Sequence, residues 1–377
     1  MRLETISFDG TKWSAGFPDL DSEQTLVLVF GASEFIDAQA PLGELRAAYP
    51  RSKLTGCSSA GEIHGTRVLD GTLSVAVAKF DHTPLALTFT TVKGSEHSFG
   101  AGEILARELA KPDLRSILIL SEGLNVNGSE LVRGVNSVVP STVIVTGGLA
   151  GDGSRFKRTW VLRGGEASSN LVAAIGFYGD RVVIGHGSKG GWDKFGPERK
   201  VTKSKANVLY ELDGSPALAL YKKYLGDRAS ELPASGLLFP LSLRANADED
   251  KSLVRTILAI DEENQSMTFA GDIPEGHLVQ LMRANMDRLI GAATTAAEMT
   301  RAANDGGGDT LAVAISCVGR RLVLGERIEE ETESALEVLP KGTKQVGFYS
   351  YGEISPYTIG SCDLHNQTMT LTTVTER

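Results

Sequence analysis

The sequence is poor in cysteine and has no long hydrophobic run. Its three cysteines, Cys57, Cys317 and Cys362, are too few and too scattered for a disulfide framework or a zinc knuckle. No stretch approaches the ~20 continuous apolar residues of a membrane span. The start MRLETISFDG also lacks the basic and apolar regions of a signal peptide. These absences predict a cytoplasmic protein without membrane insertion.

Basic clusters and recognisable catalytic patterns are missing as well. With 38 Lys and Arg against 47 Asp and Glu, the net charge is −9, which argues against a broad nucleic-acid surface. The sequence contains neither a Walker loop nor a dinucleotide fingerprint. No pair of acids is singled out for opposing acid and base roles. The pattern therefore favours a binding protein over an enzyme and excludes nucleic acid as a partner.

Glycine is abundant, with 42 in 377 residues, and many glycines fall where apolar strands end. Three segments repeat one plan: an apolar strand, a helix, a second strand ending in a Gly-containing loop, and a third strand. They span residues 25–80, 116–179 and 310–376. Each has a glycine at a similar distance from its first strand. These distances are 30, 30 and 36 residues, from Leu26 to Gly56, Ile117 to Gly147 and Leu311 to Gly347.

Repetition on this scale indicates that one supersecondary unit was reused. We predict an α/β fold with mixed sheets and packed helices, built from repeated strand-helix-strand-loop-strand units. No flexible linker is visible near residues 180–215, so the fold should consist of two closely packed halves. The longest helical pattern covers residues 277–305. Gly loops at equivalent places would offer a shared ligand site.

The first of these loops, GCSSAGEI (56–63), offers small residues, backbone N–H groups, two hydroxyls and one acid. Such a loop can bind a carboxylate or phosphate through its N–H groups, and its acid could receive an ammonium. A tight turn with capping hydroxyls is the alternative interpretation. The candidate ligand-binding residues are Gly56, Cys57, Ser58, Ser59, Gly61 and Glu62, with Tyr351 and Glu353 from the matching loop YGEIS (351–355).

Two Gly-Glu-Ile sequences, 61–63 and 352–354, occupy matching loop positions. Glu62 and Glu353 could face one cavity, or each could tie down its own turn. The second segment has Asp152 in that region. A cysteine-dependent enzyme is a further alternative, in which Cys57 would be the nucleophile and His64 the adjacent base.

Several longer motifs resemble the FIST family, whose members pair a FIST N-terminal and a FIST C-terminal domain. The motifs are GCSSAGEI (56–63), the segment from GWDKFGPERK to LYKKYLG (191–226), CVGRRLVLGERIEEE (317–331), GFYSYGEISP (347–356) and LHNQTMTLTT (364–373). The resemblance implies an N-terminal domain over 25–214 and a C-terminal domain over 215–377. It also implies a ligand-binding sensor without catalytic activity. No output module can be read in the sequence, so such a sensor would signal through a histidine kinase or a cyclic-di-GMP signalling protein.

The same resemblance implies one possible ligand, because one stand-alone branch of the family binds haem b and senses nitric oxide. The alternative is a sensor of an amino acid or a similar small metabolite. Haem would need a proximal ligand, most simply a histidine. His186 lies between two glycines at a strand end, His365 has Asn366 and Gln367 as neighbours, and His64 follows the GCSSAGEI loop. We therefore name His186, His365 and His64 as candidates, in that order.

Overall fold

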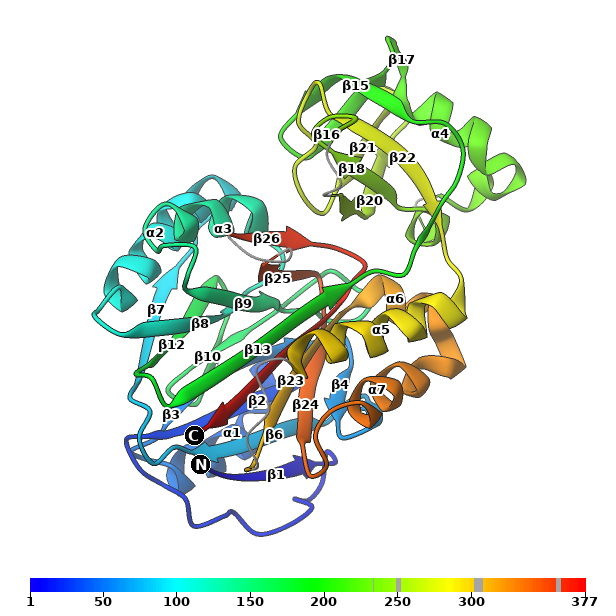
Figure 1. Cartoon of the computed structure of the whole chain (residues 1–377). Coiled ribbons are helices and arrows are strands. Elements are labelled where there is room, and N and C mark those ends of the chain that lie inside the picture. The colour runs from blue at the N-terminus through cyan, green and yellow to red at the C-terminus, as the bar shows by residue number, and fades with distance from the viewer. Residues whose placement is uncertain (233, 249–251, 302–307, 357–360) are drawn as a thin grey trace.

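The computed structural model describes residues 1–377 except 233, 249–251, 302–307 and 357–360. It consists of a large body and a smaller lobe, which are joined by two linker segments (Figure 1). Three units with one plan make up the body. Each unit is a repeated segment together with the strand that leads into it.

The elements of the three units follow in chain order. Unit 1 comprises β1 Arg2–Phe8, β2 Thr25–Ala32, α1 Ala40–Ala48, β3 Lys53–Ser59, β4 Glu62–His64, β5 Arg67–Leu69 and β6 Leu73–Lys79. Unit 2 comprises β7 Leu85–Thr91, α2 Ser98–Leu109, β8 Leu114–Ser121, α3 Gly128–Asn136, β9 Ile144–Leu149, β10 Val161–Arg163, β11 Glu166–Ser168 and β12 Leu171–Tyr178. Unit 3 comprises β13 Val182–Lys189, α5 Met286–Thr300, β23 Leu311–Cys317, α6 Val318–Leu324, α7 Ile328–Glu337, β24 Lys344–Ser350, β25 Gly352–Pro356, β26 Cys362–His365 and β27 Met369–Glu376.

Each unit contributes four strands to a six-stranded sheet, and the last two strands of that sheet come from another unit. The strand orders are β1-β6-β2-β3-β10-β11, β7-β12-β8-β9-β25-β26 and β13-β27-β23-β24-β4-β5. The hairpin β10–β11 of unit 2 thus completes the first sheet, β25–β26 of unit 3 completes the second, and β4–β5 of unit 1 completes the third. This cyclic exchange gives the body a pseudo-threefold arrangement. It also means that no unit can complete its sheet alone.

Three equivalent backbone hydrogen bonds mark the place where the units meet. The N–H of Ala60 donates to the carbonyl of Tyr349 at 2.8 Å, Gly151 to Ser58 at 3.1 Å, and Tyr351 to Leu149 at 3.0 Å. Each donor follows the second parallel strand of its own unit, and each acceptor lies near the end of the second parallel strand of another unit. The predicted Gly loops therefore gather around one pseudo-axis.

The repeated glycines are explained by contact between strands. Gly56, Gly147 and Gly347 pair in parallel with Val29, Ile119 and Ala314. A Cβ at these glycines would lie 1.8, 1.9 and 1.8 Å from the carbonyl oxygens of those three partners. Only glycine permits so close an approach. The repeat detected in the sequence is thus a packing requirement of the sheets.

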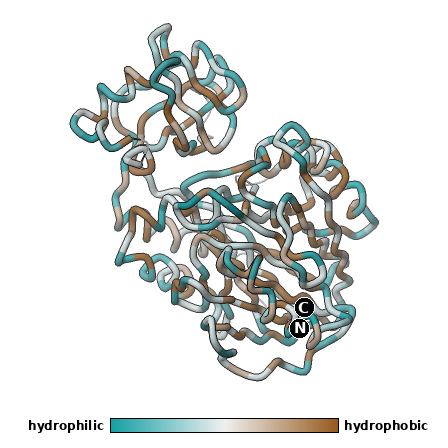
Figure 2. The backbone as a smooth tube through the Cα atoms, turned by 180° about the vertical axis from the view of Figure 1, so that it is seen from behind, coloured by the Kyte–Doolittle hydropathy of each residue, from teal (hydrophilic) through white to brown (hydrophobic). Residues whose placement is uncertain are grey.

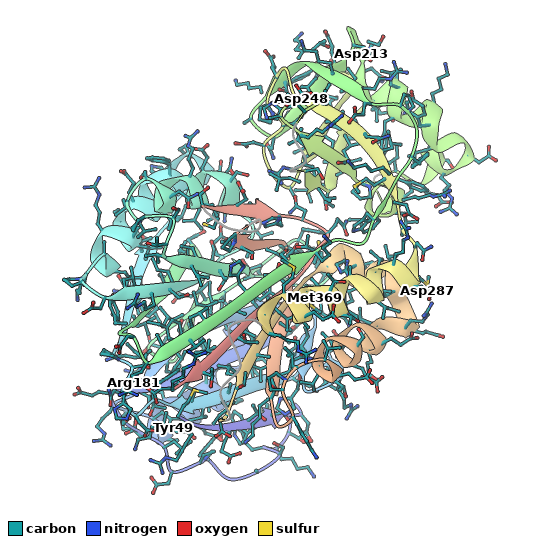
Figure 3. The ribbon with its side chains drawn as sticks, viewed as in Figure 1. Tyr49, Arg181, Asp213, Asp248, Asp287 and Met369 are labelled. Carbon is teal, nitrogen blue, oxygen red and sulfur yellow. The ribbon has the colours of Figure 1, made fainter. Side chains whose placement is uncertain are left out.

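The inner faces of the three sheets pack on one another, and the helices lie outside. One hydrophobic cluster joins side chains of all three sheets, and within it Phe30 stacks on Phe348 with ring centroids 5.0 Å apart. Helices α2 and α3 pack together beside the second sheet, and α5 and α7 beside the third (Figure 1). Hydrophobic segments concentrate in the central strands (Figure 2). Met369, at the start of β27, is fully buried (Figure 3).

The lobe is an insertion into unit 3, between β13 and α5. It comprises β14 Asp193–Lys194, β15 Arg199–Lys205, β16 Val208–Leu212, β17 Ser215–Pro216, α4 Ala217–Leu225, β18 Leu241–Arg244, β19 Leu253–Arg255, β20 Ile257–Asp261, β21 Ser266–Phe269 and β22 Leu278–Arg283. These strands form one sheet, and its own hydrophobic cluster packs α4 against it. Asp213 and Asp248 lie on the lobe, away from the centre of the body (Figure 3).

The predicted α/β class and the repeated units are confirmed, with three differences. In each unit, a hairpin replaces the simple loop expected between the second and third strands. The hairpin forms because the chain pairs with the sheet of another unit before it returns to its own sheet. The helix expected over 277–305 is a strand, β22, followed by α5, and residues 302–305 lie outside the described residues. Close packing of two halves holds for unit 3 against units 1 and 2, whereas the lobe projects from the body (Figure 1) and contacts it along one side, where β19 lies beside β26.

Candidate functional site

Most of the GCSSAGEI segment is strand, contrary to the predicted loop. Gly56, Cys57 and Ser58 lie inside β3 and are buried, so their backbone groups serve the sheet. Ala60 and Gly61 form the short connection to β4. Cys57 belongs to the central hydrophobic cluster, and burial raises the pKa of its thiol well above the ordinary value. Cys57 therefore lacks the exposed, activated setting of a nucleophile.

Two of the predicted ligand residues, Ser59 and Glu62, do line a cavity of about 330 Å³. We call it the Glu62 cavity; its other wall is the loop Asp152–Arg155 of unit 2. The hydroxyl of Ser59 accepts a hydrogen bond from the Gly61 N–H at 2.8 Å. The Glu62 carboxyl accepts from both the N–H and the hydroxyl of Thr72, at 3.1 and 3.0 Å. These polar groups are satisfied inside the protein.

Glu353 is the structural counterpart of Glu62, but it is completely buried and does not line the Glu62 cavity. Its carboxyl accepts from the N–H and hydroxyl of Thr368 at 3.2 and 2.9 Å, as Glu62 does from Thr72, and from Ser350 at 2.5 Å. The sequence left open whether these acids face one cavity or each tie down their own turn. The hydrogen bonds favour the second role, since each acid links its hairpin to the start of the third strand of its unit. Tyr351 instead donates its hydroxyl to Asp152 and stacks on Phe156 with centroids 4.4 Å apart.

Replacing Glu353 with glutamine should flatten the dependence of stability on pH. Burial raises the pKa of Glu353 from 4.5 to about 8, so between these values the folded chain keeps a proton that the unfolded chain releases. Stability therefore falls as pH rises through this window. Glutamine imitates the protonated carboxyl and removes the effect. We expect the wild-type melting temperature to fall from pH 5 to pH 8 and that of Glu353→Gln to fall less.

Glu62→Gln provides a matched comparison, because burial raises the pKa of Glu62 to about 8 as well. Glu333→Gln, at an exposed position of α7, is the control that should follow the wild-type curve. Parallel melting curves for all four proteins would contradict the assignment of protonated, structural carboxyls.

The three candidate histidines occupy different settings. His64 lies on β4, with its Nδ1 3.1 Å from the Ser74 hydroxyl. His186 lies on β13, and its buried Nδ1 has no hydrogen-bond partner among the described residues. His365 is buried, with its Nε2 3.0 Å from the Ser355 carbonyl oxygen. His365 also lines a cavity of about 310 Å³ beside the linker Gly190–Trp192, which we call the hinge cavity.

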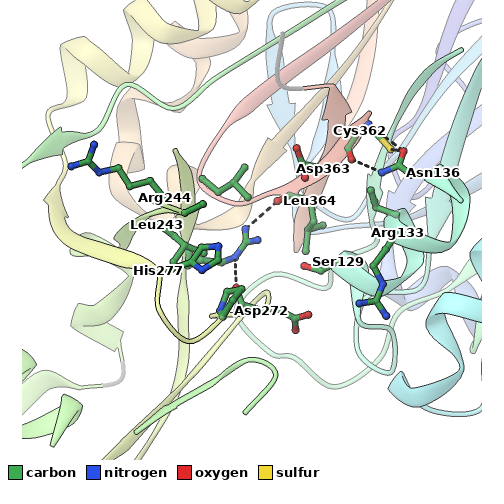
Figure 4. Close-up of a pocket in the computed structure, with 15 residues that line it drawn as sticks. Ser129, Arg133, Asn136, Leu243, Arg244, Asp272, His277, Cys362, Asp363 and Leu364 are labelled. Carbon is green, nitrogen blue, oxygen red and sulfur yellow. Dashed lines mark hydrogen bonds between the residues drawn. The ribbon is translucent and has the colours of Figure 1, made fainter. Parts of the chain in front are cut away.

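Another cavity, which the sequence analysis did not predict, lies between the lobe and the body. This interlobe cavity has a volume of about 330 Å³ (Figure 4). Helix α3 of unit 2 and strand β26 of unit 3 form its body side, while lobe residues form the opposite side. Its charged lining side chains are Arg133, Arg244, Arg255, Asp272 and Asp363.

Arg255 connects the two sides of the interlobe cavity. Its side chain is almost completely buried, the residue being 4% exposed. Nε donates to the carbonyl of Asp272 in the lobe at 3.1 Å, and Nη1 donates to the carbonyl of Leu364 in the body at 3.0 Å (Figure 4). Burial lowers the pKa of Arg255 to about 10, which still leaves it charged at neutral pH. A second link runs from Asn127 Nδ2 to the Asp272 carboxylate at 3.0 Å.

One sequence signal could have pointed to this site. Arg255 is the one charged residue in the mainly apolar run 253–258, LVRTIL, and a charge in such a segment needs a reason. The pairing of the lobe with α3 and β26 could not be inferred, because these elements are far apart in the sequence. Among the described residues, no group of His, Cys, Asp and Glu side chains is arranged to hold a metal ion. No helix of the described chain is long and apolar enough to cross a membrane.

Comparisons with known proteins identify two matching domain families. The profile of the FIST N domain matches residues 25–215, and that of the FIST C domain matches residues 217–356. An uncharacterized protein of Methanocaldococcus jannaschii is 26% identical over 168 residues, which are 40% of this chain and 31% of that protein. The chain thus matches less than a third of that relative's length.

Among solved structures, the crystal structure of cyanuric acid hydrolase from A. caulinodans aligns with 78% of this chain and 99% of its own. The sequence identity is 11% and the TM-score is 0.19. A score this low carries no argument about fold or activity.

Proposed function

Because this chain belongs to the FIST family, we propose that it is a sensor whose small ligand binds in the interlobe cavity. FIST domains are associated with the sensing of small ligands in signal transduction, and they are sensory rather than catalytic. An amino acid or a similar small metabolite is the ligand that we propose first. The sensor would signal through a separate partner, such as a histidine kinase or a cyclic-di-GMP signalling protein.

The observation that carries this proposal is the position of Arg255. A buried guanidinium forms part of the cavity wall and is hydrogen-bonded to both lobe and body. Ligand sites are commonly found between domains, where a few polar groups converge in a largely apolar cavity. A volume of about 330 Å³ lies at the lower end of the range for small-molecule sites.

The location also provides a means of signalling. The chain enters and leaves the lobe through the segments 190–192 and 284–285. The orientation of the lobe therefore depends on its noncovalent contacts with the body, including those across the cavity. A ligand that touches both sides favours the arrangement in which they are close, and thereby shifts the population of lobe positions. A partner that contacts lobe and body would bind the two arrangements with different affinities.

Ligand binding should be detectable as a rise in melting temperature, since a ligand at 100 times its Kd adds about 2.7 kcal/mol to stability. We would screen amino acids and related metabolites against the wild type and against Ala245→Trp. Ala245 is an exposed residue that lines the cavity, so tryptophan there should fill the entrance. Ala247→Trp, nearby in the chain and also exposed, is the control. A hit that stabilises Ala245→Trp as strongly as Ala247→Trp would place the ligand elsewhere.

Haem b with nitric oxide as the signal is our second proposal, and His365 supports it best. Its Nε2 lies beside a backbone carbonyl, and metal-ligating histidines usually donate their other ring N–H to such a group. Trp192, Met282 and Met299 add apolar walls to the hinge cavity. Haem iron held there would supply the site that binds nitric oxide. At about 310 Å³, the cavity would have to widen to admit the macrocycle.

The absorption spectrum of protein expressed with added haem tests this second proposal. We expect a Soret band that is lost in His365→Ala and kept in His64→Ala and His186→Ala. Loss of haem in His186→Ala alone would move the ligand to β13, the first choice from the sequence. A wild type that takes up no haem would leave the metabolite as the proposed signal.

A further inference from the structure

We propose that the interlobe cavity binds a carboxylate group, which is held by Arg255 and Ser129 at the N-terminus of α3. The proposal rests on the ligand-sensing function above and names the chemistry of that site. Two features of the cavity lining carry it: the incompletely used guanidinium of Arg255, and the buried, unpartnered hydroxyl of Ser129 in the first turn of α3.

Arg255 has donors to spare. A guanidinium carries five N–H donors, and the hydrogen bonds of Arg255 use Nε and Nη1, toward the carbonyls of Asp272, Leu364 and Val254. Nη2 has no hydrogen bond to any described residue. Nor does any described carboxylate form an ion pair with this guanidinium, although Asp272 and Asp363 lie near enough to act on its charge. A buried charge without a direct counter-ion is costly, and a bound anion would compensate it.

Ser129 adds a hydroxyl with no assigned role. Its Oγ is buried and has no hydrogen-bond partner in the described part of the chain, and the residue lines the same cavity. The two groups converge next to Gly271: a Cβ at that glycine would lie 3.0 Å from Arg255 Nε and 3.3 Å from Ser129 Oγ. The guanidinium of Arg255 and the hydroxyl of Ser129 therefore lie near one another, and both residues line the cavity.

The helix that carries Ser129 favours the same ligand charge. Ser129 is the second residue of α3, whose N-cap Asn127 accepts from the N–H of Glu130. The N-terminus of a helix carries a partial positive charge and N–H groups that attract anions. The first turn of α3 therefore adds to the positive potential of Arg255.

The number of donors selects a carboxylate over a phosphate. Nη2 offers two N–H groups and Ser129 one hydroxyl, which suits the two oxygens of a carboxylate. A phosphate dianion presents three oxygens and more charge, and Asp272 and Asp363 in the wall would repel that additional charge. If the ligand is an amino acid, its ammonium group could face the carboxylates of Asp272 and Asp363 while its carboxylate binds Arg255.

Fluorine NMR with trifluoroacetate as the probe tests the site directly. Trifluoroethanol has the same fluorinated group without a carboxylate and serves as the matched probe. We expect the wild type to broaden the trifluoroacetate signal, and not that of trifluoroethanol, at constant ionic strength. Acetate should compete with trifluoroacetate more strongly than inorganic phosphate at equal concentration; stronger competition by phosphate would overturn the assignment to carboxylates.

Ser129→Ala is the decisive variant, because its hydroxyl makes no hydrogen bond that folding needs. We expect it to melt at or above the wild-type temperature and to bind trifluoroacetate at least about fivefold more weakly, since a hydrogen bond to a charged group is lost. Arg255→Lys keeps the charge but not the planar fork and should bind more weakly still. The probe would be used at about 10 millimolar, since so small a ligand binds weakly. Two results would overturn the proposal: unchanged affinity in Ser129→Ala, or no broadening of the trifluoroacetate signal by the wild type.

The experiment separates this inference from the proposed function. If a metabolite without a carboxylate stabilises the wild type but not Ala245→Trp, the sensing function stands and the carboxylate site is wrong. If trifluoroacetate binds as expected while no metabolite raises the melting temperature, the anion site stands and the sensing function loses its support.

Discussion

Replacing Arg320 with alanine is expected to lower the free energy of unfolding by about 3–5 kcal/mol, the usual cost of breaking a buried ion pair. Arg320 and Glu331 are both completely buried, with Arg320 Nε 2.6 Å from the Glu331 carboxylate. The same carboxylate accepts from Ser316 at 3.0 Å and Tyr349 at 2.7 Å. Without Arg320, a buried negative charge would remain without its counter-ion. Urea unfolding followed by circular dichroism would measure the loss.

Arg320 also holds one linker of the lobe directly and the helix α5 that follows the other linker. Its guanidinium donates to the carbonyl of Gly190, where the chain leaves the body, and to that of Leu289 at 2.7 Å, just after the chain returns. The substitution should therefore also make both linker segments more susceptible to limited proteolysis. This second readout distinguishes an anchor of the hinge from a purely local ion pair.

Arg321→Ala is the matched control for Arg320→Ala. Its partner Asp70 is largely exposed, and such pairs contribute about 0–1 kcal/mol. Arg321 also donates to the carbonyl of Ala60, but its loss leaves no buried charge without a counter-ion. A double variant, Arg320→Met with Glu331→Met, should recover much of the stability, because no charge then stays buried. If Arg320→Ala and Arg321→Ala proved equally stable, the buried pair would not have the role assigned to it.

Alanine at Gly347, Gly56 or Gly147 should prevent stable folding, at a cost of at least about 3 kcal/mol, beyond ordinary overpacking. In each case the new methyl group would lie less than 2 Å from a backbone carbonyl oxygen of the adjacent parallel strand. Backbone within a sheet cannot rotate away as a side chain can. Soluble yield and melting temperature of the three variants would show the effect.

Gly43→Ala tests whether the cost comes from the strand contact or from losing a glycine. Gly43 is an exposed position of α1. Outside the helix itself, no described residue lies within 4 Å of the place that a methyl group would take there. Alanine there should stabilise the protein by about 0.5–1 kcal/mol, because glycine is a poor helix former. Normal folding of Gly347→Ala would show that the strands can separate, and the account of the repeat would fail.

The candidate site was only partly predictable. The sequence directed attention to Ser59 and Glu62, which do line a cavity, and to His365, which lines another. It gave the same weight to Cys57, which is buried in the core. Periodicity identifies residues that are buried, but it does not say whether they face a cavity or other side chains. Ser129 and Arg255 went unrecognised because their significance arises from a contact between distant segments.

The amino-acid sequence by itself determined the class of fold, the three repeated units and the positions of their close-packed glycines. These features depend on local hydrophobic patterns and on residue types that only one backbone arrangement tolerates. The tertiary structure alone decided the exchange of hairpins between sheets, the insertion of the lobe into unit 3 and the cavity beneath it. Such features depend on which surfaces meet across long separations in the chain, and local patterns do not encode that choice of partner.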